Sequence, residues 1–308
     1  MKKALVTGGA GFIGAHLVRR LVEAEYEVVV VDNLSWGDAR KLPTKGTRLI
    51  NDSVLNLSKY EPELTGVTHV FHLAALISAY DSLLTPDPYV ETNVLGLQRV
   101  LEACAKLERP RLVFASTSGI YGNTQQPMKV ETDAPQPATV YALTKLAGEH
   151  LLEMYRERFH YDDVSLRLFN VYGPGQSPKH PYANVTCKFS RAAALGEGVK
   201  LYGDGSQTRD FIYVDDVVDA FLLAGSRPCR HRLYNVGTGA QASIATLLEL
   251  AQQVADTQLQ VERLPDWPND IRAIGADCTR LFGEHGFSPK VSLREGLART
   301  VQFFRENR

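Results

Sequence analysis

The stretch VTGGAGFIG (residues 6–14) decides the fold. It follows a short apolar run and opens an amphipathic stretch over residues 12–25, so it predicts a strand, a tight loop and a helix in that order. Gly8, Gly11 and Gly14 have the spacing G-x-x-G-x-x-G. Without side chains, the backbone can approach a pyrophosphate at the helix N-terminus, where unpaired N–H groups favour negative charge. The stretch therefore predicts a dinucleotide-binding turn.

The carboxylate of Asp32 indicates which dinucleotide binds. Asp32 ends the next apolar run, EVVVVDN (27–33), 18 residues after Gly14. A carboxylate at this place accepts hydrogen bonds from the ribose hydroxyls of the adenosine and repels a 2′-phosphate. We therefore expect NAD as the cofactor and not NADP. The alternative is a structural glycine turn beside a surface aspartate.

The first half of the chain alternates apolar runs with amphipathic stretches. Continuous apolar runs are typical of strands that helices cover on both faces, as in a parallel sheet. The alternation predicts an α/β fold with a doubly wound parallel sheet of the Rossmann type. The expected strands are 3–8, 27–33, 48–52, 69–75, 111–117 and 164–170, and the expected helices are 12–25, 88–107 and 141–159.

The texture of the sequence changes after about residue 170, where glycine and proline become frequent. We expect loops at 202–209 and 263–270, and helices near 185–196, 215–225, 243–255 and 292–306. The prediction is a dinucleotide-binding domain over residues 1–168, to which 211–236 returns, and a smaller mixed α/β substrate-binding lobe over 169–308.

Composition excludes several classes of protein. Of the 308 residues, 44% are hydrophobic and 22% charged, and the net charge of −1 gives no reason to expect nucleic acid or an anionic membrane as a partner. No apolar stretch approaches the roughly 20 residues of a membrane-spanning helix. The opening apolar stretch breaks at Gly8, too early for a signal peptide. The four cysteines form no CxxC pair, so we expect no metal site, no disulfide framework and a reducing, cytoplasmic location.

Three side chains have the chemistry of an oxidoreductase-type site. Tyr141 and Lys145, in YALTK (141–145), are one helical turn apart. A free tyrosine has a pKa near 10, and a neighbouring ammonium and a positive nicotinamide ring lower that pKa, so that the tyrosine can act as a base. Thr117 ends an expected strand, where open α/β sheets bind ligands, and can hydrogen-bond the same substrate oxygen. Alone, a tyrosine–lysine pair is more often a surface pair.

Ordered motifs along nearly the whole chain resemble the extended short-chain dehydrogenase/reductase family, in its nucleotide-sugar epimerase/dehydratase branch. They are TGGAGFIG (7–14), VDNLSWG (31–37), HLAA (72–75), ASTSGIYG (115–122), YALTK (141–145), RLFNVYGPG (167–175) and GDGSQTRDFIYVDD (203–216). The resemblance implies tightly held NAD, a nucleotide-sugar substrate that is most often UDP-linked, and a homodimer.

The resemblance also carries site residues onto this chain. It implies NAD contacts at Gly8, Gly11, Phe12, Ile13, Gly14, Asp32, Asn33, Ser35, Gly37, Asp52, Ser53, Leu73, Ala74, Ala75, Asn93, Tyr141, Lys145 and Phe169. It implies substrate contacts at Ser78, Thr117, Ser118, Tyr141, Asn170, Tyr202, Arg209 and Asp270.

Two of these substrate contacts have structural alternatives. The planar guanidinium of Arg209 suits a diphosphate, and the alternative is a structural pair with Asp210. Asn170 follows an expected strand and could instead cap a loop. His72 is expected to be a packed, hydrogen-bonded histidine.

The residues after Thr117 favour one reaction within the family. In the family that the chain resembles, dehydratases carry a pattern like T-D-E at this place, related decarboxylating enzymes a glutamate, and 3,5-epimerases a cysteine. This chain has Ser118 and Gly119 there. Glycine has no proton to give or take, and a 4-epimerase needs only Thr117, Tyr141 and Lys145. We therefore expect an NAD-dependent 4-epimerase of a UDP-hexose that acts through a transient 4-keto sugar. A 4,6-dehydratase, a uronate 4-epimerase and a non-enzymatic NAD-binding redox regulator remain the alternatives.

Two departures from the family pattern concern the substrate. WPND (267–270) has Trp267 where many relatives carry an arginine that grips the diphosphate. Uronate 4-epimerases carry a pattern like T-V-Y-G-P where this chain has Asn170 and GPGQSP. This difference favours a neutral hexose as the substrate. Ile274, at the place that gates the sugar pocket by resemblance, leaves an N-acetylated sugar open.

Overall fold

The structure is a computed structural model and describes residues 2–108, 110–178, 183–266 and 271–307. Trp267 and Asp270, predicted from the family pattern, lie outside the described residues. The chain forms two compact units, each made of three segments. The first unit contains Met1–Ile120, Pro135–Arg167 and Val218–Tyr234, and the second contains Tyr121–Ala134, Leu168–Val217 and Asn235–Arg308.

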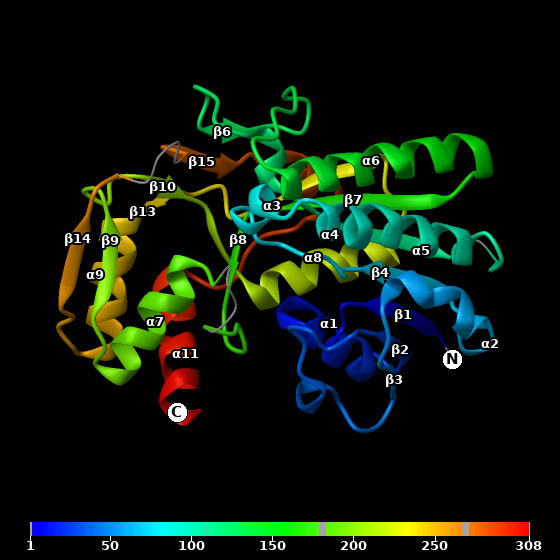
Figure 1. The fold of residues 1–308 in the computed structure, drawn as a ribbon, viewed down its shortest axis with the longest axis horizontal. Helices are drawn as coiled ribbons and strands as arrows, with labels where there is room; N and C mark the ends of the chain where they lie inside the picture. The colour runs from blue at the N-terminus through cyan, green and yellow to red at the C-terminus, as the bar shows by residue number, and fades with distance from the viewer. Residues whose placement is uncertain (1, 109, 179–182, 267–270, 308) are drawn as a thin grey trace. The chain divides into compact units, whose positions relative to one another are not determined.

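A seven-stranded sheet forms the centre of the first unit, in the order β12-β7-β5-β4-β1-β2-β3 (Figure 1). The neighbours of β1, and the pairs β2–β3 and β4–β5, are parallel. This confirms the predicted doubly wound sheet. Its strands are β1 (Lys3–Thr7), β2 (Glu27–Val31), β3 (Thr47–Ile50), β4 (His69–His72), β5 (Arg111–Thr117), β7 (Asp162–Leu168) and β12 (Leu233–Val236).

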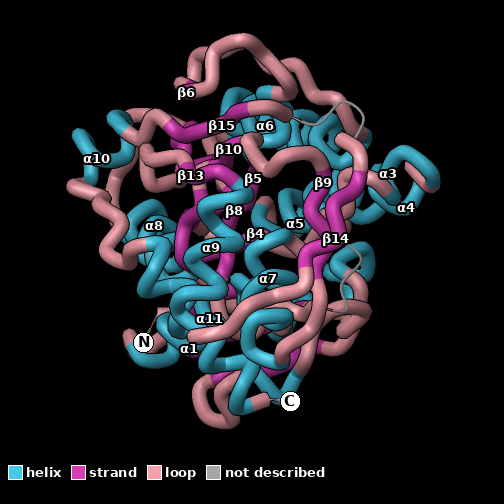
Figure 2. The backbone as a smooth tube through the Cα atoms, turned by 90° about the vertical axis from the view of Figure 1, so that its left-hand side faces the viewer, coloured by secondary structure: helices cyan, strands magenta, loops and turns pink. Residues whose placement is uncertain are grey.

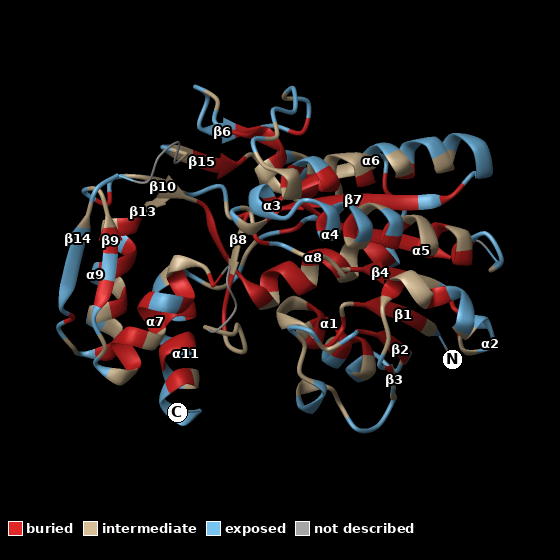
Figure 3. Ribbon diagram, viewed as in Figure 1, coloured by how far each residue is buried: buried red, intermediate tan, exposed pale blue. Residues whose placement is uncertain are grey.

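The continuous apolar runs explain why these strands lie inside. Val28 to Val31 in β2 are at most 1% exposed, and Figure 3 shows β4 and most of β7 buried. Helices α1 (Phe12–Glu23), α5 (Gly96–Cys104) and α6 (Val140–Phe159) cover the sheet. Burying apolar area at about 25 cal/mol per Å² is the main stabilising contribution of such a core.

The expected single helix over 88–107 is wrong in detail. Residues here form α4 (Asp87–Tyr89), a π-helical segment η3 (Val90–Leu95) and then α5. A π segment is rare and breaks the ordinary helical register, so the 3.6-residue pattern does not reveal it. Shorter elements of this unit are η1 (Ala39–Lys41), η2 (Val54–Tyr60), α2 (Glu61–Leu64), α3 (Asp81–Leu84) and η4 (Ser118–Tyr121), and α8 (Val214–Ser226) belongs to both units.

The second unit contains three small sheets. One has the order β13-β10-β15-β6, and parallel pairs β8–β11 and β9–β14 form the others (Figure 2). The strands are β6 (Met128–Lys129), β8 (Asn170–Tyr172), β9 (Val199–Tyr202), β10 (Thr208–Arg209), β11 (Phe211–Tyr213), β13 (Ala242–Ser243), β14 (Val261–Leu264) and β15 (Ala273–Ala276). The helices are α7 (Val185–Leu195), α9 (Ile244–Ala255), α10 (Thr279–His285) and α11 (Leu293–Glu306).

The elements of the second unit agree with most of the sequence expectations. Helices α7, α9 and α11 begin and end within one residue of their predicted ranges. The loop expected at 263–270 is wrong at its start, because β14 continues to Leu264 and pairs with β9. No helix within the described residues has the length and apolar character to span a membrane. Cys104, Cys187, Cys229 and Cys278, all within the described residues, form no disulfide.

Candidate functional site

The glycine loop between β1 and α1 packs closely against the backbone that follows β4. Gly8 has a φ of +70°, and a Cβ there would lie 2.7 Å from the amide nitrogen of Ala74. At Gly14, a Cβ would lie 2.2 Å from the carbonyl oxygen of Gly8. No side chain caps the N-terminus of α1 at Gly11. The loop therefore joins two predicted NAD-binding segments and leaves helix N–H groups for a pyrophosphate.

Asp32 ties the glycine loop to the segment after β2. Its side chain is buried, with Oδ2 accepting from the Ala10 amide (3.0 Å) and Oδ1 from the Leu34 amide (2.8 Å). A Cβ at Gly37 would lie 2.8 Å from Oδ1, so the carboxylate and Gly37 are neighbours. A carboxylate has about four acceptor sites, and two remain for the ribose hydroxyls of a dinucleotide.

Asp52 is held by its own neighbours on η2. It accepts hydrogen bonds from the Tyr60 hydroxyl (2.7 Å), the Asn56 amide (2.8 Å) and the Ser53 backbone (2.7 Å). The Tyr60 hydrogen bond is the first cause that lowers the pKa of Asp52 to about 2. Asp52 is therefore a fixed acceptor at neutral pH, at a position where an NAD contact is predicted.

Asn93 links the segment after β4 to helix α6. Its side chain is 2% exposed, accepts from the Leu76 amide (2.8 Å) and donates to the Leu76 carbonyl (3.0 Å). It also donates to the Thr144 hydroxyl (2.9 Å), which in turn donates to the carbonyl of Tyr141 (2.7 Å). The π turn that carries Asn93 thus connects a predicted NAD contact to the helix of the predicted base.

Lys145 is buried beside β5, 3% exposed, with its Nζ donating to the carbonyl of Ala115 (2.8 Å). The Nζ also lies 4.8 Å from the ring centroid of Phe114. Burial lowers the pKa of Lys145 to about 7. Tyr141 lies one turn before it, partly exposed, with its backbone N–H donating to the Ser82 hydroxyl (3.1 Å). The ammonium and the phenol therefore share one face of α6.

Thr117 ends β5 with its hydroxyl oriented by the backbone. Its Oγ1 accepts from the Gly119 amide (3.1 Å), so its own hydrogen can be donated to a ligand. A Cβ at Gly119 would meet Thr117 Oγ1 at 3.4 Å and Ala142 Cβ at 3.6 Å, which is ordinary contact. The fold does not require glycine here, in contrast to Gly8 and Gly14.

Ser78 and Ser118 also belong to the first unit. Ser78 is 5% exposed, and its Oγ accepts from the Asp81 amide (3.1 Å) at the start of α3. Ser118 is partly exposed and begins η4, directly after Thr117.

The other predicted substrate residues lie in the second unit. Arg209 donates from Nη1 to the carbonyls of Thr208 (2.8 Å) and Ile271 (2.5 Å), and Asn170 donates to the carbonyl of Asp210 (3.4 Å). Tyr202 ends β9 and is partly exposed, and Phe169 is buried in a small core with Tyr121.

Asp210, which the sequence analysis considered only as a partner of Arg209, organises this region. Its carboxylate accepts from the Thr238 amide (2.8 Å) and hydroxyl (2.7 Å), the Gly239 amide (3.0 Å) and the Ala276 amide (3.1 Å). Four donors fill the acceptor sites of a carboxylate, which argues against the alternative of an Arg209–Asp210 pair. In the sequence, the only signal of this role is an aspartate next to an arginine and followed by the apolar run FIYV (211–214).

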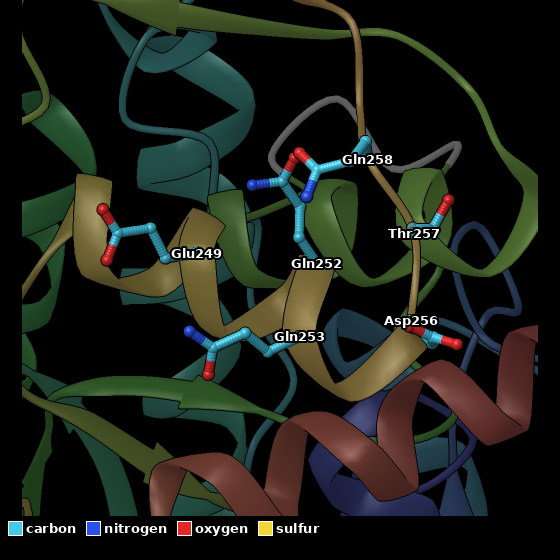
Figure 4. Close-up of a pocket in the computed structure, with 6 residues that line it drawn as sticks. All are labelled: Glu249, Gln252, Gln253, Asp256, Thr257 and Gln258. Atoms are coloured by element: carbon cyan, nitrogen blue, oxygen red, sulfur yellow. The ribbon is translucent and has the colours of Figure 1, made fainter.

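His72 and a pocket at the end of α9 lie outside the predicted site. His72 is fully buried, its Nδ1 lies 2.7 Å from the Thr7 hydroxyl, and burial lowers its pKa to about 3, so it is a neutral packed histidine as expected. A polar pocket at the end of α9 is lined by Glu249, Gln252, Gln253, Asp256, Thr257 and Gln258 (Figure 4). The Gln252 side chain accepts a hydrogen bond from the Leu259 amide (2.9 Å) and so stabilises the loop that follows α9. The described residues contain no cluster of three metal-ligating side chains.

Comparison with known proteins identifies the family of the chain. Residues 4–237 match the profile of the NAD dependent epimerase/dehydratase family. A UDP-glucose 4-epimerase of Mycolicibacterium smegmatis is 39% identical over 98% of both chains. The crystal structure of Thermus thermophilus UDP-glucose 4-epimerase in complex with NAD superposes with a TM-score of 0.91 at 37% identity, covering 98% of this chain and 99% of that one. A UDP-N-acetylglucosamine 4-epimerase from Methanobrevibacter ruminantium, solved with UDP-N-acetylmuramic acid, has a TM-score of 0.94 at 33% identity over 100% and 99% of the two chains.

Proposed function

The chain belongs to the NAD dependent epimerase/dehydratase family, and within it we propose an NAD-dependent nucleotide-sugar 4-epimerase that acts on a UDP-hexose. NAD is the cofactor, and similarity to UDP-sugar 4-epimerases groups the enzyme with the isomerases. The residues fit a dinucleotide, because the crowded glycine loop excludes side chains and Asp32 keeps acceptor sites for ribose. When bound there, NAD would supply reversible hydride transfer with a sugar carbon.

In the proposed reaction, Tyr141 removes the proton of the sugar 4-hydroxyl. The buried ammonium of Lys145, one helical turn away, favours the phenolate. Thr117 donates its hydroxyl hydrogen to the same sugar oxygen, because the Gly119 amide already occupies its acceptor side. The 4-keto sugar then rotates, and Tyr141 returns the proton after hydride is delivered to the opposite face.

The glycine at position 119 is the main support for a 4-epimerase. Its φ and its surroundings allow a side chain, so its identity is not a demand of the backbone. Dehydration needs a base that removes the C5 proton, and at this position the chain has none. The small residue leaves space beside the Thr117 hydroxyl, as rotation of the keto sugar requires.

The second unit supplies the proposed nucleotide-sugar contacts. Arg209 and Asn170 are both held on the backbone of Asp210 and its neighbours, which fixes the donors for a diphosphate. The named relatives act on UDP-sugars, which supports UDP over other nucleotides. We propose a neutral hexose, with an N-acetylated hexose as the second choice.

A homodimer is the proposed assembly. Leu83 and Leu84 on α3, Val90 on η3, and Leu143 and Met154 on α6 are 45–64% exposed. Both α3 and η3 contact α6, so these side chains belong to neighbouring helices of the first unit. Exposed apolar side chains gathered on neighbouring helices favour association with a second copy. Four cysteines that form no disulfide support a reducing, cytoplasmic location.

The proposed function is tested with a panel of UDP-, dTDP-, GDP- and CDP-sugars, with products identified by NMR. We expect a UDP-hexose to give its 4-epimer with no net change in NADH absorbance. A 4-keto-6-deoxy product would establish a dehydratase instead, and activity confined to UDP-uronates would establish a uronate 4-epimerase. If Tyr141→Phe left the cellular role intact, the protein would be a non-catalytic NAD-binding regulator.

A further inference from the structure

A buried ion pair lies one helical turn beyond Lys145. Glu149 on α6 accepts from Arg167 on β7 through two parallel hydrogen bonds, Nε to Oε1 (3.0 Å) and Nη2 to Oε2 (2.7 Å). The side chains of Arg167 and Glu149 are 3% and 10% exposed. Glu149 Oε1 also accepts from the Ser116 hydroxyl over 2.5 Å. The carboxylate therefore joins α6 to two strands of the sheet.

We propose that Glu149 is a positioning residue, which with Arg167 fixes helix α6 against the end of β5 and so sets Tyr141 relative to Thr117. The inference rests on the proposed function for the roles of Tyr141 and Thr117. It adds a residue that contacts neither substrate nor cofactor.

The spacing of the contacts supports this role. Tyr141, Lys145 and Glu149 follow one another at four-residue intervals and so lie along one stripe of α6. Opposite them, Lys145 binds the carbonyl of Ala115 and Glu149 binds the hydroxyl of Ser116, the two residues directly before Thr117. The helix therefore holds consecutive residues of the strand, and the next residue along is the one that carries the working hydroxyl.

Gly148 brings the helix close enough for these bonds. A Cβ at position 148 would lie 2.7 Å from Cζ of Phe114, so any side chain would push α6 away from β5. One face of α6 thus contacts the three residues that precede Thr117: Phe114, Ala115 and Ser116. Such a fixed approach matters because misplacing reacting groups by about 1 Å can cost on the order of 100-fold in rate.

The charge of Glu149 is part of the device. A carboxylate accepts from Ser116 and from both arms of Arg167 at once, whereas an amide offers one acceptor oxygen and one donor nitrogen. In Glu149→Gln, the nitrogen would face a guanidinium donor in either orientation: Nη2 in one, and Nε together with the Ser116 hydroxyl in the other. The register between α6 and the end of β5 would then loosen while the size of the side chain stays the same.

The chain contains a matched control for this substitution. Asp163 on β7 accepts two parallel hydrogen bonds from Arg156 on α6 (2.9 and 2.8 Å), and its side chain is fully buried. Arg156–Asp163 joins the same helix and strand, but Arg156 lies about two turns beyond Glu149, and the two parallel hydrogen bonds of this pair do not involve β5 residues 115–117. Asp163→Asn therefore removes an equivalent buried charge without touching the end of β5.

The experiment compares Glu149→Gln and Asp163→Asn in the NAD-loaded enzyme, at temperatures where both are folded. We expect kcat to fall about 10- to 100-fold in Glu149→Gln, with KM within about twofold, and to change less than about threefold in Asp163→Asn. Equal losses of kcat in the two variants would overturn the inference. If Glu149→Gln does not fold, Ser116→Ala, which leaves the ion pair in place, should lower kcat about 3- to 10-fold at unchanged KM, and an unchanged kcat would overturn the inference.

A second readout does not depend on which reaction the enzyme catalyses. Amide hydrogen exchange at residues 115–119 should be faster in Glu149→Gln, and in Ser116→Ala, than in the wild type and in Asp163→Asn. If the wild type gives a product other than a 4-epimer, the proposed function fails, yet faster exchange at 115–119 would still support the positioning role. Unchanged exchange there would overturn the role whatever the product.

Discussion

The backbone amide of Gly119 donates to the hydroxyl oxygen of Thr117 over 3.1 Å, so the residue without a side chain orients the hydroxyl beside it. This relationship separates two functions of Gly119. Its N–H group serves Thr117, and its missing Cβ keeps the space next to that hydroxyl open. The first function survives substitution by any residue except proline, and the second does not.

Substitutions at Gly119 should therefore distinguish size from backbone effects. Gly119→Ala should keep stability within about 1 kcal/mol, because its Cβ would find contacts of 3.4 Å or longer. Gly119→Glu should lower kcat/KM at least about 10-fold by filling the space for sugar rotation. Steady-state epimerisation and thermal unfolding check both. Gly14→Ala is the contrast, since a Cβ 2.2 Å from the Gly8 carbonyl should abolish NAD retention. An active Gly119→Glu enzyme would contradict the proposed need for space.

Removing the phenol of Tyr141 should separate chemistry from binding. Tyr141→Phe keeps the ring on α6 but has no group to take the sugar proton, so kcat should fall about 100- to 10,000-fold. NAD content and UDP affinity should stay within about threefold of the wild type. Product formation followed by NMR, with NAD quantified after denaturation, makes the comparison. Activity within about fivefold of the wild type would rule Tyr141 out as the base.

The buried ammonium of Lys145 should make stability depend on pH. Burial lowers its pKa from 10.5 to about 7, so between these pH values the unfolded chain binds more protons than the folded one. The free energy of unfolding should then rise with pH from about 7 to about 10.5. Lys145→Met removes this titration. The wild type minus Lys145→Met difference, from urea unfolding at several pH values, should increase over that range.

A lysine on the surface provides the control. Lys188 is exposed on α7, and Lys188→Met shows how much of any pH dependence comes from removing one positive charge from the chain. If the difference for Lys145→Met does not exceed that for Lys188→Met, burial does not lower the pKa of Lys145.

Much of this fold follows from the sequence because local patterns and tertiary contacts agree. The valine run of β2 is apolar on both faces and could only be a covered strand, and the glycine loop has no conformational alternative once β1 and α1 are set. The spacing of Tyr141 and Lys145 gave their common helical face directly.

The remainder depends on contacts between segments far apart in the chain. The π turn at Asn93 forms because its amide finds Leu76 and Thr144, and neither neighbour is close in sequence. Asp210 likewise binds a residue of β15, and Glu149 binds a residue of β7. The periodicity of the sequence does not predict either contact. The short parallel pair β8–β11 joins residues about 40 apart, so its strands have no local signature.

Asp32 should determine the choice between NAD and NADP. A hydrogen bond to a charged group contributes about 1.5–3 kcal/mol, so Asp32→Ser should weaken NAD binding about 10- to 100-fold. It should also remove the repulsion of a 2′-phosphate and narrow the preference for NAD over NADP. Titration calorimetry with both dinucleotides checks this, and Asp38→Ser, which removes a nearby carboxylate paired with Arg40, should leave the preference unchanged. An unchanged preference in Asp32→Ser would contradict the assignment.

Asn93 should couple stability to cofactor binding. Asn93→Ala removes the side-chain partner of the partly buried N–H and C=O of Leu76, at a cost of about 1–3 kcal/mol, and releases Thr144 on α6. We expect both a lower melting temperature and weaker NAD binding, because the freed segment adjoins Ala74 at the glycine loop. Asn184→Ala, which removes the cap of α7 in the second unit, costs about 1 kcal/mol and should spare NAD affinity. If both variants were less stable but bound NAD with unchanged affinity, Asn93 would stabilise the fold without contributing to cofactor binding.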